Sequence, residues 1–422
     1  MTAMKKITAL ALAGLMLLLS GCGAKAGPES GFQPDFTVSN FIYGSMVATE
    51  DGYFVELFNR VYYVEAETMD YILFCADPSC DHHKYNGEAD NLDCLARYVG
   101  GGLGAIQYYD GELYFTRYDD GSSGYMVDTI MAVKSDTTGL RDVQERFNQK
   151  TDRWPANIGG SHFDYAYAIL GDAIMFCPRA FMVKVGKLGD SIENAKELFT
   201  YDKLEPRFNG TELHWDIWVD GGYFYYCGVN YPDGVIKGQP SQLLYRYDLA
   251  TEENALIWRS DEQAGAASVD GWYLRDGVFY YYINEQPYGN AESGLYRCDL
   301  ETMETVKLSN CSGFGGNSAA EFDSEYAYIM EYDFNAITVL SLTDGRETVR
   351  LDLNAAAFSD GVTIKPDYGS FFRAFCVAGA DETWLFVILE GYDSDDGFHY
   401  MLYGIEKEHF AKNEWRLIID SA

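Results

Sequence analysis

Residues 276–303 read DGVFYYYINEQPYGNAESGLYRCDLETM. The stretch holds a turn signal (Asp276-Gly277), an aromatic run, a polar loop, a second aromatic run and another turn (Glu301-Thr302-Met303). Asp-Gly pairs are typical of two-residue hairpin turns, and runs rich in Tyr, Phe, Val and Ile are typical of strands. The stretch therefore predicts consecutive hairpins of one antiparallel sheet.

The turn signal followed by an aromatic strand occurs seven times along the chain. The seven copies begin at Asp51, Asp110, Gly171, Asp220, Asp276, Asp323 and Asp381. Their spacing of roughly 47 to 60 residues is typical of a propeller blade of four strands. The sequence predicts an all-β protein, a seven-bladed β-propeller of four-stranded antiparallel blades.

The N-terminal residues have the pattern of a targeting segment. Lys5 and Lys6 precede an apolar run, Ile7–Leu18, which is too short to span a bilayer. The following Leu19-Ser20-Gly21-Cys22 resembles the lipobox of bacterial lipoproteins, which implies cleavage before Cys22 and a diacylglyceryl anchor on that cysteine. A plain secretory signal with a chance cysteine is the alternative.

These features predict three regions: a lipoprotein signal peptide over 1–21, a lipidated flexible tether over 22–35 and the propeller over 36–422. Within the propeller, we expect the first blade to begin with a strand near 36–44 and the last to end with a strand at 415–420. Each blade then consists of consecutive strands, and side-chain packing alone joins the first blade to the last. The expected location is extracytoplasmic, on the outer face of the cytoplasmic membrane.

The formal net charge is −34, and removal of residues 1–21 takes away two lysines and no acid. Nucleic-acid binding needs a basic footprint, so the charge excludes that class and leaves the lipid as the membrane contact. Solubility explains the acidity, and calcium sites are the alternative. The run at 393–397 (DSDDG) resembles the start of a calcium loop but lacks the later bidentate Glu, so calcium is not favoured.

The lengths of the connections differ in a regular way. With strands labelled A to D from the axis outward, the A–B and C–D turns are predicted to be short, whereas the B–C and D–A connections are long. Up-and-down strands place the two long classes on one face of the ring, and loops on a rigid scaffold are where ligands usually bind.

The long loops carry Tyr125, Tyr231, Tyr288 and Tyr392 beside amides and carboxylates. Flat rings next to hydrogen-bonding groups suit sugars and extended peptides, so these tyrosines are the predicted ligand-binding residues. The alternative is that each ring only packs within its own loop. No feature of the sequence indicates an oligomeric state.

One dense cluster, Cys75, Cys80, His82 and Cys94, falls in the D–A connection after the first blade. Three thiols and one imidazole can supply tetrahedral ligands for a structural zinc ion. A disulfide with one leftover thiol, or three free thiols, are the alternatives outside the membrane. The remaining cysteines are expected to be buried, and Cys298 is expected to lie nearest Lys307 across its hairpin.

The pattern Cys75-x4-Cys80-x-His82 followed by Cys94-Leu95-Ala96, at the end of the first repeat of an acidic lipoprotein, resembles uncharacterised β-propeller surface lipoproteins of Gram-positive anaerobic bacteria. The resemblance implies a fold and a location and no activity.

Enzyme motifs are not found: the sequence has no G-x-S-x-G, no P-loop and no H-E-x-x-H. His162, His214, His399 and His409 are scattered and are interpreted as structural. The favoured function is binding of a glycan or peptide, or scaffolding of an envelope complex, through the long-loop face. A carbohydrate-active hydrolase or lyase that uses the same face is the alternative.

Overall fold

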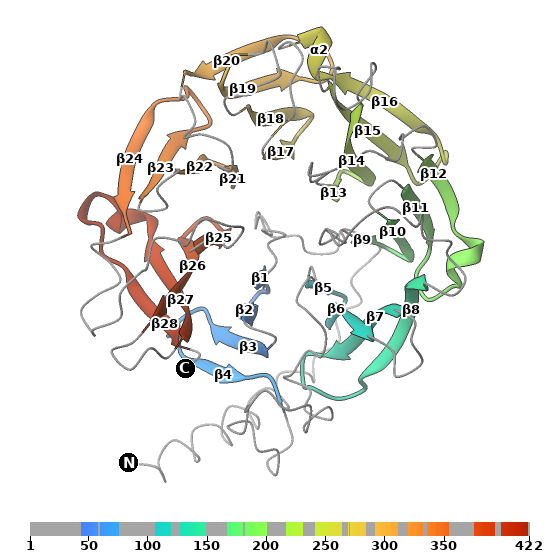
Figure 1. Ribbon diagram of the computed structural model, residues 1–422, viewed down its shortest axis with the longest axis horizontal. Helices are drawn as coiled ribbons and strands as arrows, with labels where there is room; N and C mark the ends of the chain where they lie inside the picture. The colour runs from blue at the N-terminus through green and yellow to red at the C-terminus, as the bar shows by residue number, and fades with distance from the viewer. Residues whose placement is uncertain are drawn as a thin grey trace. The chain divides into compact units, whose positions relative to one another are not determined.

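The structure is a computed structural model of the full chain (Figure 1). It describes residues 44–57, 60–75, 106–119, 127–148, 167–179, 182–200, 217–230, 241–263, 269, 271–283, 292–310, 320–331, 336–353, 375–392 and 398–420. All of them belong to one compact unit, Pro34–Ala422. Among these residues, no helix is long and apolar enough to cross a membrane.

Seven antiparallel sheets of four consecutive strands make up the described fold. The first four blades consist of β1 (Gly44–Ala48), β2 (Gly52–Leu57), β3 (Arg60–Glu65) and β4 (Tyr71–Leu73); β5 (Gln107–Tyr109), β6 (Glu112–Asp119), β7 (Val127–Lys134) and β8 (Arg141–Asn148); β9 (Tyr167–Leu170), β10 (Ala173–Arg179), β11 (Met182–Lys187) and β12 (Lys196–Thr200); and β13 (Ile217–Asp220), β14 (Tyr223–Asn230), β15 (Ser241–Asp248) and β16 (Asn254–Arg259).

The last three blades consist of β17 (Trp272–Arg275), β18 (Val278–Ile283), β19 (Gly294–Asp299) and β20 (Thr305–Ser309); β21 (Ala320–Phe322), β22 (Tyr326–Met330), β23 (Ala336–Ser341) and β24 (Glu347–Asp352); and β25 (Phe375–Ala380), β26 (Trp384–Tyr392), β27 (Phe398–Glu406) and β28 (Arg416–Asp420). Three short helical segments complete the described elements: η1 (Ile192–Asn194), α2 (Ser260–Gln263) and η2 (Lys407–Lys412).

The blades follow one another around a closed ring in chain order (Figure 1). The first strand of every blade lies innermost and contacts the first strand of the next blade, and β25 contacts β1. The predicted seven-bladed β-propeller of four-stranded blades is therefore confirmed. Consecutive strands in every blade, including the first and the last, are also as predicted.

Side chains of the B strands are buried because each B strand lies between two neighbouring blades. All six residues of β2 are buried, whereas β4 at the outer edge has two exposed residues out of three. A strand covered on both faces has a continuous apolar sequence instead of an alternating one. This burial explains why the aromatic runs after the turn signals are the strongest repeat in the sequence.

One expectation about the ends of the ring needs correction. The described part of the first strand is Gly44–Ala48, and residues 36–43, where that strand was expected to begin, lie outside the described residues. The first and last blades share an apolar cluster that includes Met46, Val55, Phe386 and Leu402, but packing does not act alone there. A side-chain hydrogen bond of 2.6 Å also crosses the seam, from the Tyr53 hydroxyl to Asp381 Oδ2.

Tight turns gather at one end of the strands. The A–B turns have two or three residues and the C–D turns have five to nine. In the two-residue turn Asp110-Gly111, both residues have positive φ angles (48° and 79°), as a type I′ hairpin requires. The B–C and D–A connections lie at the other end. The D–A connections are all long, with 10 to 33 residues, but the B–C connections have two to ten, and those at 58–59 and 180–181 have only two. The expectation that the B–C connections are long is therefore wrong for part of the ring. We call the two ends the tight-turn face and the long-loop face.

The pairing of C and D strands contains a register shift in six of the seven blades. In the fifth blade the shift lies between Leu295 and Tyr296, and Cys298 pairs with Thr305. The expectation that Cys298 lies nearest Lys307 is therefore wrong, because Lys307 pairs with Tyr296. Burial of Cys177, Cys227 and Cys298 agrees with the prediction.

Candidate functional site

Most residues predicted as sites from the sequence lie outside the described part of the chain. Cys75 follows β4 and is half-buried, with no disulfide partner among the described residues. Cys80, His82 and Cys94 lie outside them, so the zinc site and its disulfide alternative both stay predictions. Cys22 also lies outside them.

The structure also leaves the predicted ligand-binding tyrosines untested. Tyr125, Tyr231 and Tyr288 are outside the described residues. Tyr392 ends β26, where its backbone pairs with that of Phe398. The structure does not describe the Tyr392 side chain, so its role as a ligand contact stays a prediction.

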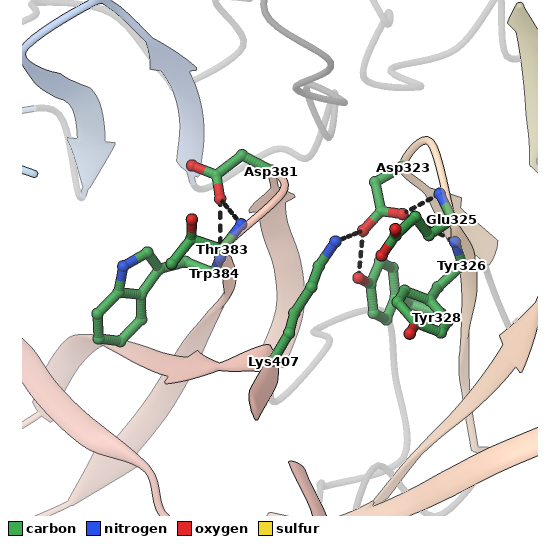
Figure 2. A network of polar contacts seen from close by, with 8 residues as sticks. All are labelled: Asp323, Glu325, Tyr326, Tyr328, Asp381, Thr383, Trp384 and Lys407. Atoms are coloured by element: carbon green, nitrogen blue, oxygen red, sulfur yellow. Dashed lines mark hydrogen bonds and ion pairs between the residues drawn. The ribbon is translucent and has the colours of Figure 1, made fainter. Parts of the chain in front are cut away.

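The best-defined polar site among the described residues lies on the opposite, tight-turn face, in the sixth and seventh blades (Figure 2). Its centre is Asp323, which is fully buried in the A–B turn of the sixth blade. Asp323 Oδ1 accepts hydrogen bonds from the backbone N–H groups of Glu325 and Tyr326, at 2.7 and 2.8 Å. Backbone donors thus hold one oxygen of this carboxylate and stabilise the three-residue turn.

The other oxygen of Asp323 faces two side chains. Tyr328 donates its hydroxyl to Oδ2, and Lys407 Nζ lies 2.8 Å from the same atom (Figure 2). Burial, together with the neighbouring Asp323 charge, raises the pKa of Tyr328 well above its ordinary value, so this hydroxyl stays protonated and donates. Lys407 begins η2 in the seventh blade, so this ion pair joins two blades.

Lys407 is nearly buried, with 9% of its side chain exposed. Its ammonium also lies over the Tyr326 ring, 5.2 Å from the centroid. The Lys407 backbone N–H donates to the carbonyl of Thr383 at 2.8 Å, which ties η2 to the A–B turn of its own blade. A buried ion pair of this kind costs desolvation energy, and specific geometry compensates for that cost.

Asp381 repeats the arrangement one blade further on. Its Oδ1 accepts hydrogen bonds from the backbone N–H groups of Thr383 and Trp384, each at 2.7 Å (Figure 2). Its Oδ2 accepts a hydrogen bond from the Tyr53 hydroxyl of the first blade. Burial and the Asp381 charge raise the pKa of Tyr53. Both oxygens of Asp323 and of Asp381 therefore already accept hydrogen bonds. The two carboxylates have a structural role, because they link the sixth blade to the seventh and the seventh blade to the first.

A second group of titratable side chains lies directly beside Lys407. His409 Nδ1 is 3.5 Å from Glu406 Oε2, and His409 Nε2 is 3.5 Å from Glu408 Oε1. Glu414 Oε2 lies 4.0 Å from His409 Nδ1. One ligand atom from each of Glu406, Glu408 and His409 lies within 4.8 Å of the others, so these residues are able to hold a metal ion. We call Glu406, Glu408, His409 and Glu414 the His409 cluster.

The tight-turn face is strongly acidic around both groups. The A–B turns contain no Lys or Arg and hold the acids Glu50, Asp51, Asp110, Asp172, Asp276, Asp323, Glu325, Asp381 and Glu382. The C–D turns hold the acids Glu67, Asp70, Asp136, Asp190, Glu193, Glu252, Glu253, Glu301, Glu304, Asp344, Glu408 and Glu414 against the bases Arg346, Lys407 and Lys412. This excess of carboxylates attracts cations to the face.

The sequence interpretation missed both groups. It treated His409 as structural and treated 323–325 and 381–383 as further copies of the Asp-Gly turn. A signal was available, because these two turns have three residues and lack glycine, and because the connection after Glu406 is the longest of the C–D class. Only the assembled ring shows that Lys407 of one blade reaches Asp323 of another.

No protein-family model matches the chain. No curated protein matches it either. Similar solved structures include the nidogen/laminin complex, with 10% identity, 69% of this chain and 89% of that chain covered, and a TM-score of 0.36. Two structures of AztD from Citrobacter koseri have 12% identity: the apo form covers 74% of this chain and 72% of that chain with a TM-score of 0.35, and the other covers 73% and 70% with 0.36. These TM-scores are too low to support any inference about function.

Proposed function

We propose that this protein is a lipid-anchored, extracytoplasmic β-propeller that binds a glycan or peptide through its long-loop face, either as a binding module or as a scaffold of an envelope complex. The observation that carries the proposal is the difference in length between the D–A connections and the turns of the opposite face. All fourteen A–B and C–D turns are at most nine residues long, whereas D–A gaps such as 74–106 and 353–374 are far longer. Variable loops on one face of a rigid ring are the usual site of ligand recognition.

The anchor is proposed from the Leu19-Ser20-Gly21-Cys22 motif, which supports placement on the outer face of the cytoplasmic membrane. Replacement of the lipidated cysteine, Cys22→Ala, is expected to move the protein from the detergent phase to the aqueous phase or to block its processing. Cys177→Ala serves as the control, because that cysteine is buried within the propeller. Unchanged partitioning of the Cys22 variant contradicts the anchor.

Ligand binding is best tested with a glycan array and a peptide library, followed by analysis of the bound material. Tyr231→Ala and Tyr288→Ala in the long loops are each expected to weaken binding about two- to tenfold, since an aromatic contact contributes about 0.5–1.5 kcal/mol. Tyr71→Ala is the matched control, because Tyr71 is exposed on the outer strand β4. A cleaved ligand would favour the carbohydrate-active enzyme, and equal effects of all three variants would overturn the long-loop face as the site.

A structural zinc ion bound by Cys75, Cys80, His82 and Cys94 is a separate part of the proposal. Its support is the ligand types and their spacing. Zinc analysis and mass spectrometry of the intact thiols distinguish the alternatives. If Cys80→Ser contains about one zinc ion fewer than the wild type, the zinc site is supported. If the protein is metal-free and contains a Cys–Cys bond, the disulfide is supported.

A further inference from the structure

We propose that the His409 cluster binds a divalent transition-metal ion, with one imidazole nitrogen and the carboxylates of Glu406 and Glu408 as ligands. The site lies on the tight-turn face. It is therefore separate from the cysteine cluster and from the proposed ligand-binding loops.

The donor atoms are already close to the separations that a metal requires. Ligands about 2.1 Å from a tetrahedral zinc ion are about 3.4 Å apart. His409 Nδ1 lies 3.5 Å from Glu406 Oε2 and 4.0 Å from Glu414 Oε2, whereas His409 Nε2 lies 3.5 Å from Glu408 Oε1. One ion binds only one of the two nitrogens, and one ligand atom from each of Glu406, Glu408 and His409 lies within 4.8 Å of the others. Rotation of the side chains has to shorten the longer of these separations, and the partial exposure of His409 and the large exposure of Glu408 leave room for that rotation.

The carboxylates of Glu406 and Glu408 carry negative charge that no Lys or Arg among the described residues balances. Lys407, which stands between Glu406 and Glu408 in sequence, is paired with the buried Asp323 (Figure 2). Lys412 lies 3.6 Å from Glu414. Among the described residues, His409 is the one ion-pair partner of Glu406 and of Glu408. A bound dication would balance the two carboxylates directly.

The backbone that carries the ligands is fixed on both sides. Phe410 is buried, and the Lys407 N–H donates to the Thr383 carbonyl. Asn413 ends η2 in the left-handed conformation and donates from Nδ2 to the Asp352 carbonyl at 2.7 Å. Because the short segment between these anchors has little freedom, the ligands need little ordering when the ion binds.

The ligand set also predicts which ions bind. An imidazole nitrogen beside carboxylate oxygens suits zinc and similar transition metals, whereas calcium and magnesium prefer oxygen ligands alone. The excess of acids on the tight-turn face would raise the local concentration of any cation, so selectivity separates a true site from general electrostatic attraction.

The test uses the full chain in detergent with Zn²⁺ as the probe, measured by calorimetry and by metal analysis after dialysis. His409→Gln and Glu408→Gln are each expected to weaken zinc binding at this site at least tenfold in calorimetry. Each variant should therefore retain one zinc ion fewer per chain than the wild type after dialysis. Glu301→Gln is the matched control, because Glu301 is an exposed acid in another C–D turn of the same face. Cys80→Ser is the second control. It should not change the zinc ion bound by the His409 cluster, because Cys80 belongs to the separate cysteine cluster.

A large excess of Ca²⁺ should leave this zinc equivalent bound. The proposal is overturned if His409→Gln binds zinc as the wild type does, if Glu301→Gln weakens binding equally, or if Ca²⁺ displaces the zinc. Circular dichroism of each variant shows whether the propeller is folded, and Glu408→Gln keeps the test valid if His409→Gln does not fold.

Discussion

The hydroxyl of Tyr53 donates a 2.6 Å hydrogen bond to Oδ2 of Asp381, which is 328 positions later in the chain and lies in the last blade. No strand is exchanged between the first and last blades in the described residues. The seam therefore depends on a shared apolar cluster and on side-chain contacts such as this one.

Tyr53→Phe should lower the free energy of unfolding by about 1.5–3 kcal/mol, because it leaves a carboxylate oxygen without its donor. Hydrogen exchange should rise in β1 and β25 before it rises elsewhere. Tyr114→Phe is the control, since Tyr114 donates to Glu112 within a single blade. If both variants raise exchange at the seam equally, the Tyr53 contact does not hold the ring closed.

Lys407→Met should destabilise the protein by about 3–5 kcal/mol, because it leaves the buried Asp323 carboxylate without its cation. The double variant Asp323→Asn with Lys407→Met should lose less unfolding free energy than the two single variants lose together. Asn keeps a side-chain oxygen that accepts the backbone hydrogen bonds of the turn, and it removes the buried negative charge. Denaturant unfolding of all four proteins gives the coupling energy. Strict additivity would mean that the two residues act independently.

Gly345→Ala should destabilise far more than Gly277→Ala. Both glycines have left-handed φ angles, +70° and +76°, so both variants carry a backbone penalty of about 1 kcal/mol. A Cβ on Gly345 would lie 2.1 Å from the Leu308 carbonyl oxygen of the neighbouring blade, whereas a Cβ on Gly277 meets nothing within 4 Å. The clash should add about 2 kcal/mol, measured by thermal or denaturant unfolding. Equal losses would show that the blades can separate locally.

Glu112 should make stability depend on pH in the acid range. Two hydrogen bonds from Arg141, at 2.7 and 2.6 Å, lower the pKa of the Glu112 carboxyl in the folded state. The folded state then binds fewer protons than the unfolded state, so this contribution is complete above the ordinary carboxyl pKa of about 4.3 and is lost as the pH falls through the lowered value.

The difference in unfolding free energy between wild type and Glu112→Gln should therefore shrink as the pH falls below about 4. Glu347→Gln, at an exposed position on β24, should show no such narrowing. High salt should reduce the Glu112 effect, because the ion pair is partly exposed. A difference that stays constant across the acid range would contradict the assignment.

Local sequence determined the number of blades and the order of the strands. Asp110-Gly111 forms its turn from two residues with positive φ angles, and the aromatic runs form strands because they are rich in residues with high β-propensity. These features depend on neighbours in the sequence or on the repeat itself, so they can be read without the fold. The sequence also separated the tight A–B turns from the long D–A connections, but it overestimated the B–C connections, which have only two residues in the first and third blades.

Tertiary structure alone decided the contacts between blades. The register shift beside Tyr296 pairs Cys298 with Thr305, and no local pattern specifies such a shift. Lys407 reaches Asp323, and Tyr53 reaches Asp381, because closing the ring brings together residues that are far apart in sequence. His409 differs from these residues, because Glu406, Glu408 and Glu414 are within five positions of it in sequence. There the local path of η2 and of the turn before β28 brings three carboxylates around one imidazole.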